Sequence, residues 1–427
     1  MSSWHGKALL SFLLPGGLIV LCAAALLQGK SVSPPAAVAD FYLYATLVAG
    51  SLLAWRFQAR RALLAFLVMF LADRGMSFAQ SGGSPAMFDL LAVLLPINLV
   101  LLAFAEDMAF TLESVGVPAA LLAAQAGAVS VVSRSELAGK LEALREPIVA
   151  PQLFAWAHVP QLAFFLFLAA ALMLLLRFLL LRHPLDTGFF WAIGAAFLAV
   201  RTMGNGKMAT AYLATAGLVL AVSVVETSYR LAYHDELTRL PGRRALHQAL
   251  EKLGGRYSIA VLDIDHFKSF NDEYGHDTGD QVLRMVASRI AQVTGGGDGF
   301  RYGGEEFVVL FPERSLREAY PHLEDLRKII ARSTFNVRGP DRSHRRRKDR
   351  RAGARSRRGA PSGPRRTSVT VSIGLAAAGE QHKQVEDVIR VAVKALYRAK
   401  AAGRNRVEVA GLPRTTSRPR EQTPVGT

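Results

Sequence analysis

Long apolar runs, separated by short polar segments, fill roughly the first 225 residues of the 427-residue chain. A helix that crosses the hydrocarbon core of a bilayer needs about 20 mostly apolar residues. Eight segments approach this requirement: 8–27, 39–55, 61–79, 87–105, 116–132, 161–181, 187–203 and 208–225. The third is interrupted by Asp73 and Arg74, and the seventh is short. The sequence therefore predicts a multi-pass α-helical membrane domain over residues 1–225, with six to eight spans.

Basic residues between the apolar runs indicate an orientation, because cytoplasmic loops of membrane proteins are enriched in Lys and Arg. Three groups fall on one side if all eight segments span: Arg56, Arg60 and Arg61; Arg177, Arg182 and His183; and Arg230. A second set then falls on the other side and opposes this assignment: Lys30, Arg134, Lys140, Arg145 and Lys207. The pattern favours eight spans with both termini in the cytoplasm.

The rest of the chain reads as a soluble domain and carries most of the formal net charge of +17. Cys22 is the single cysteine in the sequence and lies in an apolar run. One cysteine allows neither a disulfide framework nor a cysteine-based metal site. The chemistry of the soluble part must therefore come from other residue types.

Two adjacent carboxylates follow two glycines in the segment Gly303-Gly304-Glu305-Glu306. Residues 299–300 and 307–311 on either side have strand character, and a Gly-Gly pair between two strands indicates a tight hairpin turn. Carboxylates at such a turn can bind a hard cation such as Mg²⁺. A solvated hairpin with two surface glutamates is the simpler alternative for this segment taken alone.

Three further segments contain residues suited to binding a nucleotide. The expected strand 257–262 ends in Asp263-Ile264-Asp265, and the end of a buried strand is a common place for a site. A helix is expected over 243–253 after the segment 235–244, and another over 281–293. A strand over 369–374 precedes a helix over 385–401 that carries Lys400, with Arg404 just beyond it. Each also has a simpler explanation: Asp263 could cap a turn, Lys268 could be a surface lysine, and Lys400 and Arg404 could complement a helix dipole.

The order of these segments is specific. DELTRLPGRR, DIDHFKSFNDEYGHDTGD, RYGGEEF, VTVSIG and ALYRAKAAGRN resemble, in this order, the GGDEF domain of bacterial diguanylate cyclases, here in a GGEEF variant. The resemblance covers about residues 230–410. It implies an α/β fold with an antiparallel-cored sheet flanked by helices, similar to nucleotidyl cyclases and polymerase palm domains. It also implies an enzyme, a nucleotidyltransferase that joins two GTP molecules into cyclic di-GMP and releases two pyrophosphates.

The resemblance assigns roles to particular residues. Asp263, the Ile264 carbonyl and Glu305 would bind Mg²⁺, two ions per site, with Mn²⁺ as a substitute. Glu305 would also activate the 3′-hydroxyl, and Glu306 and Lys268 complete the catalytic set. The substrate-binding residues would be Asn271 and Asp280 for guanine, Lys268, Lys400 and Arg404 for the triphosphate, and Phe267 and His276 for lining the nucleotide site. Asp accepts hydrogen bonds from guanine N1–H and N2–H, a pattern that adenine lacks.

This chain departs from the family pattern at four places. One is Val393, where the family usually has an Asp before the Ala-Leu-Tyr run of the last helix. Many members carry Arg-x-x-Asp before the Gly-Gly pair, where product binds and inhibits; Thr294 and Gly297 hold these positions here, so we expect no inhibitory site. A glycine is usual where Arg239 stands. The largest departure is an insertion, residues 338–366, which contains thirteen Lys and Arg against two Asp.

The insertion has three alternative interpretations. So many like charges among Gly, Pro and Ser favour a disordered, solvated loop. Attraction to anionic lipid headgroups is the second interpretation, at about 1 kcal/mol per basic residue near a membrane surface. Nucleic-acid binding is less favoured, because interleaved aromatic residues are lacking. The tail 411–427 is also expected to be disordered.

The combined prediction is a diguanylate cyclase of the bacterial inner membrane, with the domain 235–410 in the cytoplasm and residues 226–234 as a linker helix. Each domain would bind one GTP, so the active unit is expected to be a homodimer, with cyclic di-GMP effectors downstream. Two alternatives remain open: a catalytically silent membrane signalling protein that binds GTP or cyclic di-GMP, and a transporter with an attached regulatory module. The first alternative is opposed by the presence of Asp263, Glu305 and Glu306.

Overall fold

The structure is a computed structural model, and it divides into two compact units, Met1–Arg230 and Leu231–Thr427. The residues that it describes are 12–28, 34–81, 85–106, 109–132, 141, 143–154, 157–202, 207–337, 365–379 and 384–410. The expectations for the basic insertion, apart from its last two residues, and for the tail 411–427 lie outside the described residues. Each unit is treated by itself below.

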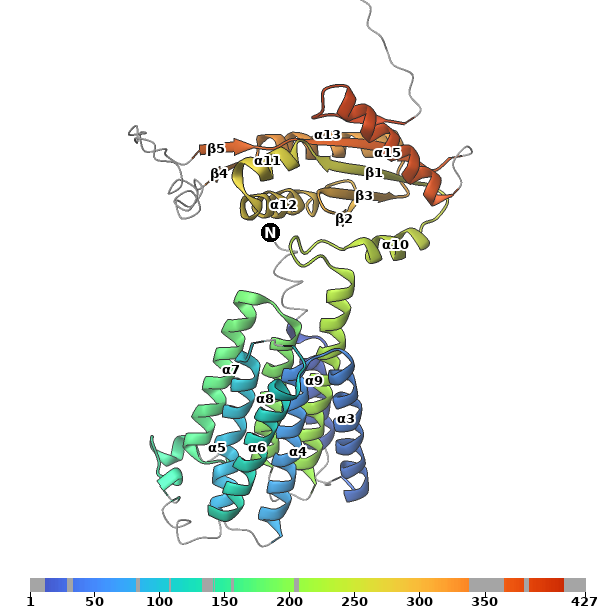
Figure 1. Ribbon diagram of the computed structural model, residues 1–427. Helices are drawn as coiled ribbons and strands as arrows, with labels where there is room; N and C mark the ends of the chain where they lie inside the picture. The colour runs from blue at the N-terminus through green and yellow to red at the C-terminus, as the bar shows by residue number, and fades with distance from the viewer. Residues whose placement is uncertain are drawn as a thin grey trace, which may run out of the picture. The chain divides into compact units, whose positions relative to one another are not determined.

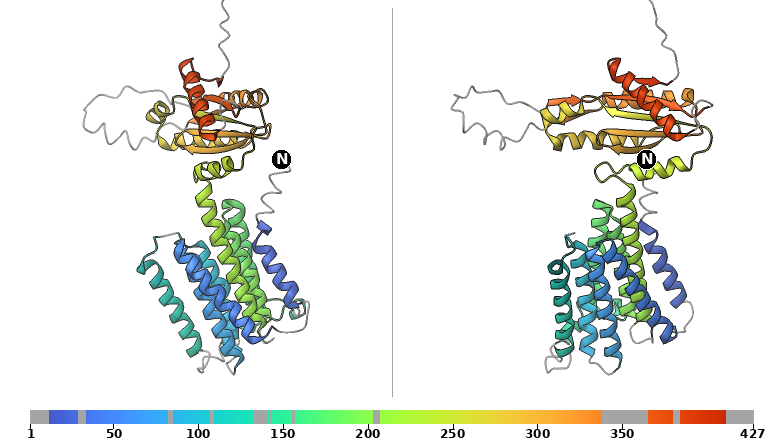
Figure 2. Two further views of the ribbon diagram at one scale, coloured as in Figure 1. Left: turned by 90° about the vertical axis from the view of Figure 1, so that its right-hand side faces the viewer. Right: turned by 45° about the vertical axis from the view of Figure 1, so that its right-hand side comes forward.

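The N-terminal unit is a bundle of helices that lie side by side (Figures 1 and 2). Its helices longer than one turn, within the described ranges, are α2 (Gly16–Gln28), α3 (Ala36–Arg56), α4 (Arg60–Gln80), α5 (Pro85–Phe104), α6 (Leu112–Val132), α7 (Gln161–Leu181), α8 (Pro184–Arg201) and α9 (Met208–Tyr233). A short 3₁₀ helix, η2 (Pro151–Leu153), precedes α7. Each of the eight apolar segments of the sequence thus corresponds to a helix.

Six of these helices are long and apolar enough to cross a membrane, by length and composition: α3, α4, α5, α6, α7 and α9. The third segment qualifies in spite of its two charges, because α4 extends over 21 residues. The other two fall short: α2 has 13 described residues, and α8 has 18 residues with lower hydropathy. The expectation of six to eight spans is met at its lower limit in the part of the chain that the structure describes.

Charged residues inside this bundle are paired. Asp89 of α5 accepts a hydrogen bond from Arg145 at 2.7 Å, and Asp186 of α8 accepts one from Arg177 of α7 at 2.9 Å. Arg60 and Arg61, both buried, donate to backbone carbonyls. Burial of an unpaired charge is costly, so these partners explain how the charges are accommodated among apolar helices.

The C-terminal unit is built on a five-stranded mixed sheet in the order β2-β3-β1-β6-β7. Its strands are β1 (Tyr257–Ile264), β2 (Asp298–Gly303), β3 (Glu306–Pro312), β6 (Val371–Ala377) and β7 (Val407–Val409). The pairs β2–β3, β3–β1 and β1–β6 are antiparallel, and β6–β7 is parallel. The antiparallel core of the sheet, expected from the family resemblance, is confirmed.

Helices cover both faces of this sheet (Figures 1 and 2). One face of β1, with Ala260, Leu262 and Ile264, packs in a core with α12 (His276–Ile290) and α13 (Leu316–Arg332). The opposite face, with Ile259 and Val261, packs with α10 (Arg243–Glu251) and α15 (Val385–Ala401). Successive side chains of a strand point to opposite faces, which explains why β1, buried at every position, serves both cores.

Two helices were absent from the expectations. These are α11 (Phe267–Tyr274) and α13, which begins with a capping box formed by Ser315 and Glu318. The helix expected at 281–293 begins earlier, at His276, directly after Gly275. The strand expected at 369–374 corresponds to β6, which begins at Val371 and extends to Ala377. A strand that was not expected, β5 (Arg365–Ser368), precedes it and pairs with β4 (Thr334–Val337) in a separate two-stranded ladder.

Candidate active site

Asp263 and Lys400 meet at one end of the sheet because the strand and the helix that carry them present these two side chains toward each other. Asp263 follows Ile259 and Val261 along the face of β1 that packs on α15, and Lys400 follows Leu396 by one helical turn. Lys400 Nζ lies 2.8 Å from Asp263 Oδ1, and the Asp263 side chain is 8% exposed. The two predicted site residues therefore form a largely buried ion pair.

The Gly303-Gly304 turn places Glu305 beside this pair. The turn joins β2 to β3, and Gly304 has a φ of 47°, in the left-handed region that glycine adopts without strain. A Cβ at either glycine would meet no atom within 4 Å, so the surface over the turn is open. Glu305 is half-buried, and Glu306, which faces Asp263 in the backbone register of β3 and β1, is exposed.

The electrostatics of Asp263 and Glu305 indicate that their charges lie close together. Burial raises the pKa of the Asp263 carboxyl, while the hydrogen bond and charge of Lys400 oppose that shift. Burial also raises the pKa of Glu305, and the negative charge of Asp263 raises it further. A cation between these two carboxylates would offset the effect of the Asp263 charge on Glu305 and stabilise both charged forms.

These residues fit a magnesium ion. The donors available are the Asp263 and Glu305 carboxylates and the carbonyl of Ile264, the last residue of β1. Within the described ranges no three His, Cys, Asp or Glu side chains gather as a metal site on their own. A hard cation such as Mg²⁺ is commonly bound by one or two carboxylates together with substrate phosphates and water.

Asn271 presents an unused acceptor. Its Oδ1 atom is buried and has no hydrogen-bond partner among the described residues. A Cβ on Gly279 of α12 would lie 1.8 Å from this atom, so the Asn271 side chain can occupy its place only because residue 279 is glycine. Asp280, the next residue of α12, is partly buried. Helices α11 and α12 thus carry both residues expected to recognise guanine.

The remaining predicted site residues lie in different surroundings. Lys268 is exposed in the first turn of α11, and His276 is exposed in the first turn of α12. Phe267 is buried and belongs to the core beneath α12, so its side chain contributes to packing as well. Arg404 is partly exposed after α15, and its charge opposes the rise in the pKa of Asp263 that burial causes, which indicates that it lies on the same side of the domain.

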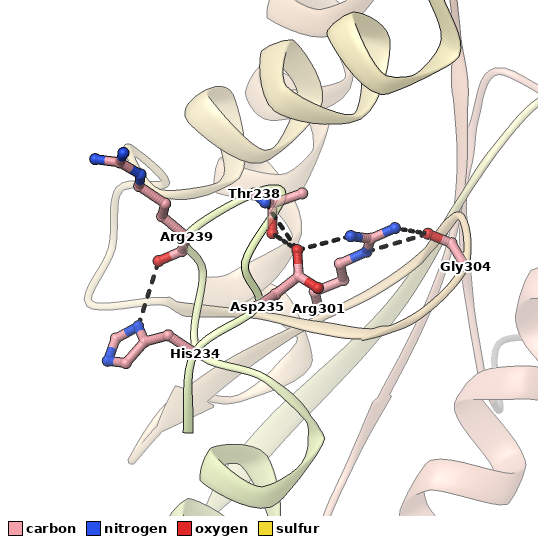
Figure 3. A network of polar contacts seen from close by, with 6 residues as sticks. All are labelled: His234, Asp235, Thr238, Arg239, Arg301 and Gly304. Atoms are coloured by element: carbon pink, nitrogen blue, oxygen red, sulfur yellow. Dashed lines mark hydrogen bonds and ion pairs between the residues drawn. The ribbon is translucent and has the colours of Figure 1, made fainter. Parts of the chain in front are cut away.

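A polar network ties the segment 235–244 to the hairpin turn (Figure 3). Asp235 Oδ1 accepts hydrogen bonds from the Thr238 amide at 2.8 Å and hydroxyl at 2.6 Å. The same oxygen accepts from Arg301 Nη1 at 2.6 Å, and Arg301 Nη2 donates to the Gly304 carbonyl at 2.7 Å. Arg301 thereby holds the turn that carries Glu305, a role that the sequence analysis did not assign.

Arg239 belongs to the same loop. Its φ is 60°, in the left-handed region, which gives a physical reason why glycine is usual at this position. Its carbonyl lies 3.3 Å from Nδ1 of His234 (Figure 3). The departure at Arg239 therefore places a non-glycine residue in a conformation that costs of order 1 kcal/mol, without moving the predicted catalytic residues.

Asp265 is a second residue whose role the sequence analysis missed. Its side chain accepts hydrogen bonds from Ser372 at 2.6 Å, Thr370 at 2.6 Å and the Asn405 amide at 3.1 Å. It is 7% exposed, and its carboxylate is occupied by protein donors, unlike that of Asp263. The hydroxyl residues of the segment SVTVS were the available signal, because they alternate opposite an Asp at the end of a neighbouring strand.

Thr294 and Gly297, at the positions of the expected inhibitory motif, are used for packing. The Thr294 hydroxyl lies 2.7 Å from Nδ1 of His322 on α13. A Cβ on Gly297 would lie 2.7 Å from the Phe311 ring and 3.0 Å from Val293. Neither residue offers a charged group.

Comparison with known proteins identifies the domain. Residues 232–347 and 350–406 match the family model described as "Diguanylate cyclase, GGDEF domain". This part of the chain is a GGDEF domain. The match includes the whole of the site described above and all of the basic insertion except residues 348 and 349.

Several relatives share the GGDEF domain with this chain. This chain is 39% identical to the diguanylate cyclase DgcP of Pseudomonas aeruginosa over 196 residues, which cover 44% of this chain and 25% of DgcP. It is 35% identical to the response regulator PleD of Caulobacter vibrioides over 191 residues, covering 43% of this chain and 37% of PleD. The chain therefore spans well under half the length of these two relatives.

A solved structure also matches the domain. The coiled coil and GGDEF domain of DgcB from Caulobacter crescentus, crystallised in complex with c-di-GMP, is 32% identical. The match covers 44% of this chain and 90% of that one, with a TM-score of 0.36.

Proposed function

We propose that this protein is a membrane-anchored diguanylate cyclase, which joins two GTP molecules into cyclic di-GMP and releases two pyrophosphates. The observation that carries the proposal is the group of Asp263, Glu305 and Lys400 beside the open Gly303-Gly304 turn of a GGDEF domain. Carboxylates for a cation and a lysine for phosphate, next to a surface without side chains, suit a nucleoside triphosphate.

The metal site would consist of Asp263, Glu305 and the Ile264 carbonyl. Bound Mg²⁺ would lower the pKa of the attacking 3′-hydroxyl and neutralise charge on the departing pyrophosphate. Glu305, whose pKa is raised by burial and by Asp263, is suited to accept the proton from that hydroxyl. Glu306 lies next to it at the start of β3 and would assist in the same site.

The substrate would be held at both ends. Lys268, Lys400 and Arg404 would bind the triphosphate. Lys400 would then leave Asp263 for a phosphate oxygen, and the cation would take its place beside Asp263. Asn271 Oδ1, buried and without a partner among the described residues, would accept a hydrogen bond from guanine, with Asp280 as the second acceptor. His276 and Phe267 would complete the wall of the nucleotide site.

The active unit would be a homodimer. One domain offers one set of these residues, so closing a ring from two GTP molecules requires two domains that face each other. The six apolar helices would anchor each copy in the bacterial inner membrane, with the GGDEF domain in the cytoplasm. Helix α9 continues from the last apolar segment to Tyr233, two residues before Asp235. Its end would serve as the linker between the apolar helices and the GGDEF domain. Anionic lipid headgroups remain the proposed partner of the basic insertion.

The test uses the full chain in lipid nanodiscs, incubated with GTP and Mg²⁺, with cyclic di-GMP and pyrophosphate measured separately. We expect two pyrophosphates per cyclic di-GMP, and a loss of at least about 100-fold in Glu305→Ala, which removes a metal ligand and the proposed base. The matched control is Glu251→Ala, an exposed glutamate at the end of α10. GTP binding without turnover in the wild type would favour the silent binding protein, and no GTP binding would overturn both.

A further inference from the structure

The segment that carries Arg404 has an unusual backbone. Gly403, Arg404 and Asn405 follow α15 with φ values of 105°, 61° and 46°, all in the left-handed region. One such residue after a helix is common, but side chains at the second and third positions are strained by of order 1 kcal/mol or more each. The amide of Arg404 donates to the carbonyl of Ala399 at 2.9 Å, which begins this turn. Other contacts must stabilise the rest of it.

Asn405 supplies two of these contacts. Its amide donates to Asp265 Oδ2 at 3.1 Å, and its side-chain Oδ1 accepts from Arg327 Nη1 of α13 at 2.7 Å. One contact comes from the residue that follows β1 and the other from helix α13. The strained residue after Arg404 is thus held through both its main chain and its side chain.

Both partners of Asn405 are themselves fixed. The carboxylate of Asp265 accepts from Ser372 and Thr370, each at 2.6 Å, and its amide donates to the Thr370 carbonyl at 2.9 Å. Arg327 makes a two-pronged contact with Glu324, at 2.6 and 2.9 Å, and its side chain is 15% exposed. Side chains held in this way lose little further freedom when they bind Asn405.

We propose that Asp265 and Arg327 are positioning residues that clamp Asn405 and thereby hold Arg404 in place to bind the triphosphate of GTP. Asp265 acts through the backbone of residue 405, and Arg327 acts through its side chain. Neither touches the substrate. The inference rests on the proposed function, and it extends that function to residues outside the predicted site.

The proposal separates the phosphate end of the nucleotide from the base end. A displaced Arg404 weakens binding of the β- and γ-phosphates and leaves contacts to guanine unchanged. Binding of GTP and of GMP to the full chain in nanodiscs is therefore compared by calorimetry, with Ca²⁺ in place of Mg²⁺ to prevent turnover. We expect Asn405→Ala and Asp265→Asn to weaken GTP binding about tenfold each, as for a lost hydrogen bond to an ionised group, and GMP binding less than about twofold.

A double-mutant cycle identifies the route of the effect. In an Arg404→Ala background, Asn405→Ala is expected to cause no further loss of GTP affinity, because the residue that it positions is gone. The control is Asp387→Asn, which removes a carboxylate paired with Arg390 at the start of α15. Asn405→Ala retains the Asp265 network, so it remains informative if Asp265→Asn does not fold.

The outcomes distinguish this inference from the proposed function. Equal losses for GTP and GMP, or losses that add to that of Arg404→Ala, overturn the clamp and leave the cyclase proposal standing. Unchanged GTP affinity in both Asn405→Ala and Asp265→Asn would likewise overturn the clamp and leave the cyclase proposal standing. A wild-type protein that binds GTP no more tightly than GMP overturns the triphosphate site itself, and with it both proposals.

Discussion

Lys400 Nζ lies 2.8 Å from Asp263 Oδ1 and joins the last turn of α15 to the end of β1. The lysine compensates a carboxylate that is otherwise buried, at the place where a cation is proposed to bind. We therefore expect the same pair to contribute to folding without nucleotide and to catalysis with it.

Removing Lys400 is expected to cost stability and activity for different reasons. Lys400→Met leaves Asp263 without its ion-pair partner, and we expect the free energy of unfolding of the GGDEF domain to fall by about 1–3 kcal/mol. Adding Asp263→Asn should restore part of this loss, because no uncompensated charge remains, while activity stays absent. Chemical denaturation gives the first quantity, and cyclic di-GMP formation gives the second.

Lys394→Met is the matched control for this cycle, since Lys394 is exposed on the same helix. Its effect on stability is expected to be within about 0.5 kcal/mol. Strictly additive stability losses for Lys400→Met and Asp263→Asn would contradict a functional ion pair.

The Asp235–Arg301 contact predicts a pH dependence of stability. Burial alone would raise the pKa of Asp235, but hydrogen bonds from Thr238 and Arg301 outweigh it and lower the pKa below its usual 3.8. A carboxyl with a lowered pKa stabilises the fold above the unfolded value and loses that contribution as the pH falls through the folded value. Asp235→Asn should therefore be less stable than the wild type at neutral pH, and this gap should close below pH 3.8.

The measurement is denaturation of the domain at a series of pH values from 7 downward. Glu318 also titrates in acid, with a pKa lowered to about 2 by its hydrogen bonds to Ser315. Taking the difference between the wild type and Asp235→Asn removes this shared contribution. Glu236→Gln, at an exposed neighbour, is the control, and a gap that persists unchanged into acid would disprove the assignment.

Gly279→Ala is expected to alter the selectivity for guanine. Its Cβ would lie 1.8 Å from Asn271 Oδ1, so the Asn271 side chain must leave its place. We expect GTP affinity to fall about tenfold and the preference for GTP over ATP to shrink, because a base contact is lost. Competition binding with the two nucleotides measures this.

Asn271→Ala is the companion variant for Gly279→Ala. If Gly279 matters only because it leaves room for Asn271, the double variant should bind GTP no more weakly than the worse single variant. Gly254→Ala, at a glycine with open space around it, should leave both affinities unchanged.

Product inhibition is expected to be weak at the position of the missing motif. Thr294 and Gly297 offer no charge for a cyclic dinucleotide. Initial rates should therefore not change when cyclic di-GMP is added, until its concentration is high enough for it to bind at other sites on the protein. Gly297→Asp would not restore a site, because its Cβ would meet Phe311 at 2.7 Å. We expect that change to cost about 1–3 kcal/mol of stability, as in an overpacked core. Saturable inhibition that Thr294→Ala abolishes would show that the position binds product after all.

The sequence predicted those elements whose residues signal them locally. The helix at 385–401 was predicted at its observed limits, with Gly403 just beyond, because apolar spacing and a terminal glycine mark both ends. The hairpin around Gly304 was predicted because two apolar strands flank two glycines. Helix α11 was missed although Phe267, Phe270 and Tyr274 follow the i, i+3, i+7 spacing of a helix, because the segment is only eight residues long and the helix depends on packing of Phe267 and Phe270 against the core.

The predicted metal ligands come together with Lys400 because the family motifs lie at strand and helix ends. The supporting contacts could not be predicted in this way. Asp265 finds its partners on β6 and after α15, and Arg301 finds Asp235 across a long stretch of sequence. Such pairs depend on sheet order and register, which a single sequence does not specify locally.

The ladder of β4 and β5 has a consequence for how this domain can change. Val337 and Arg365 are partners in its register, so the two residues that flank segment 338–364 lie side by side. The entropy of closing a loop grows only slowly with its length. This segment could be lengthened, shortened or exchanged for another while β4 and β5 remain paired, and the positions of Asp263 and Glu305 would not change. The domain thus contains a ready insertion point, where a new binding partner can be acquired without redesigning the catalyst.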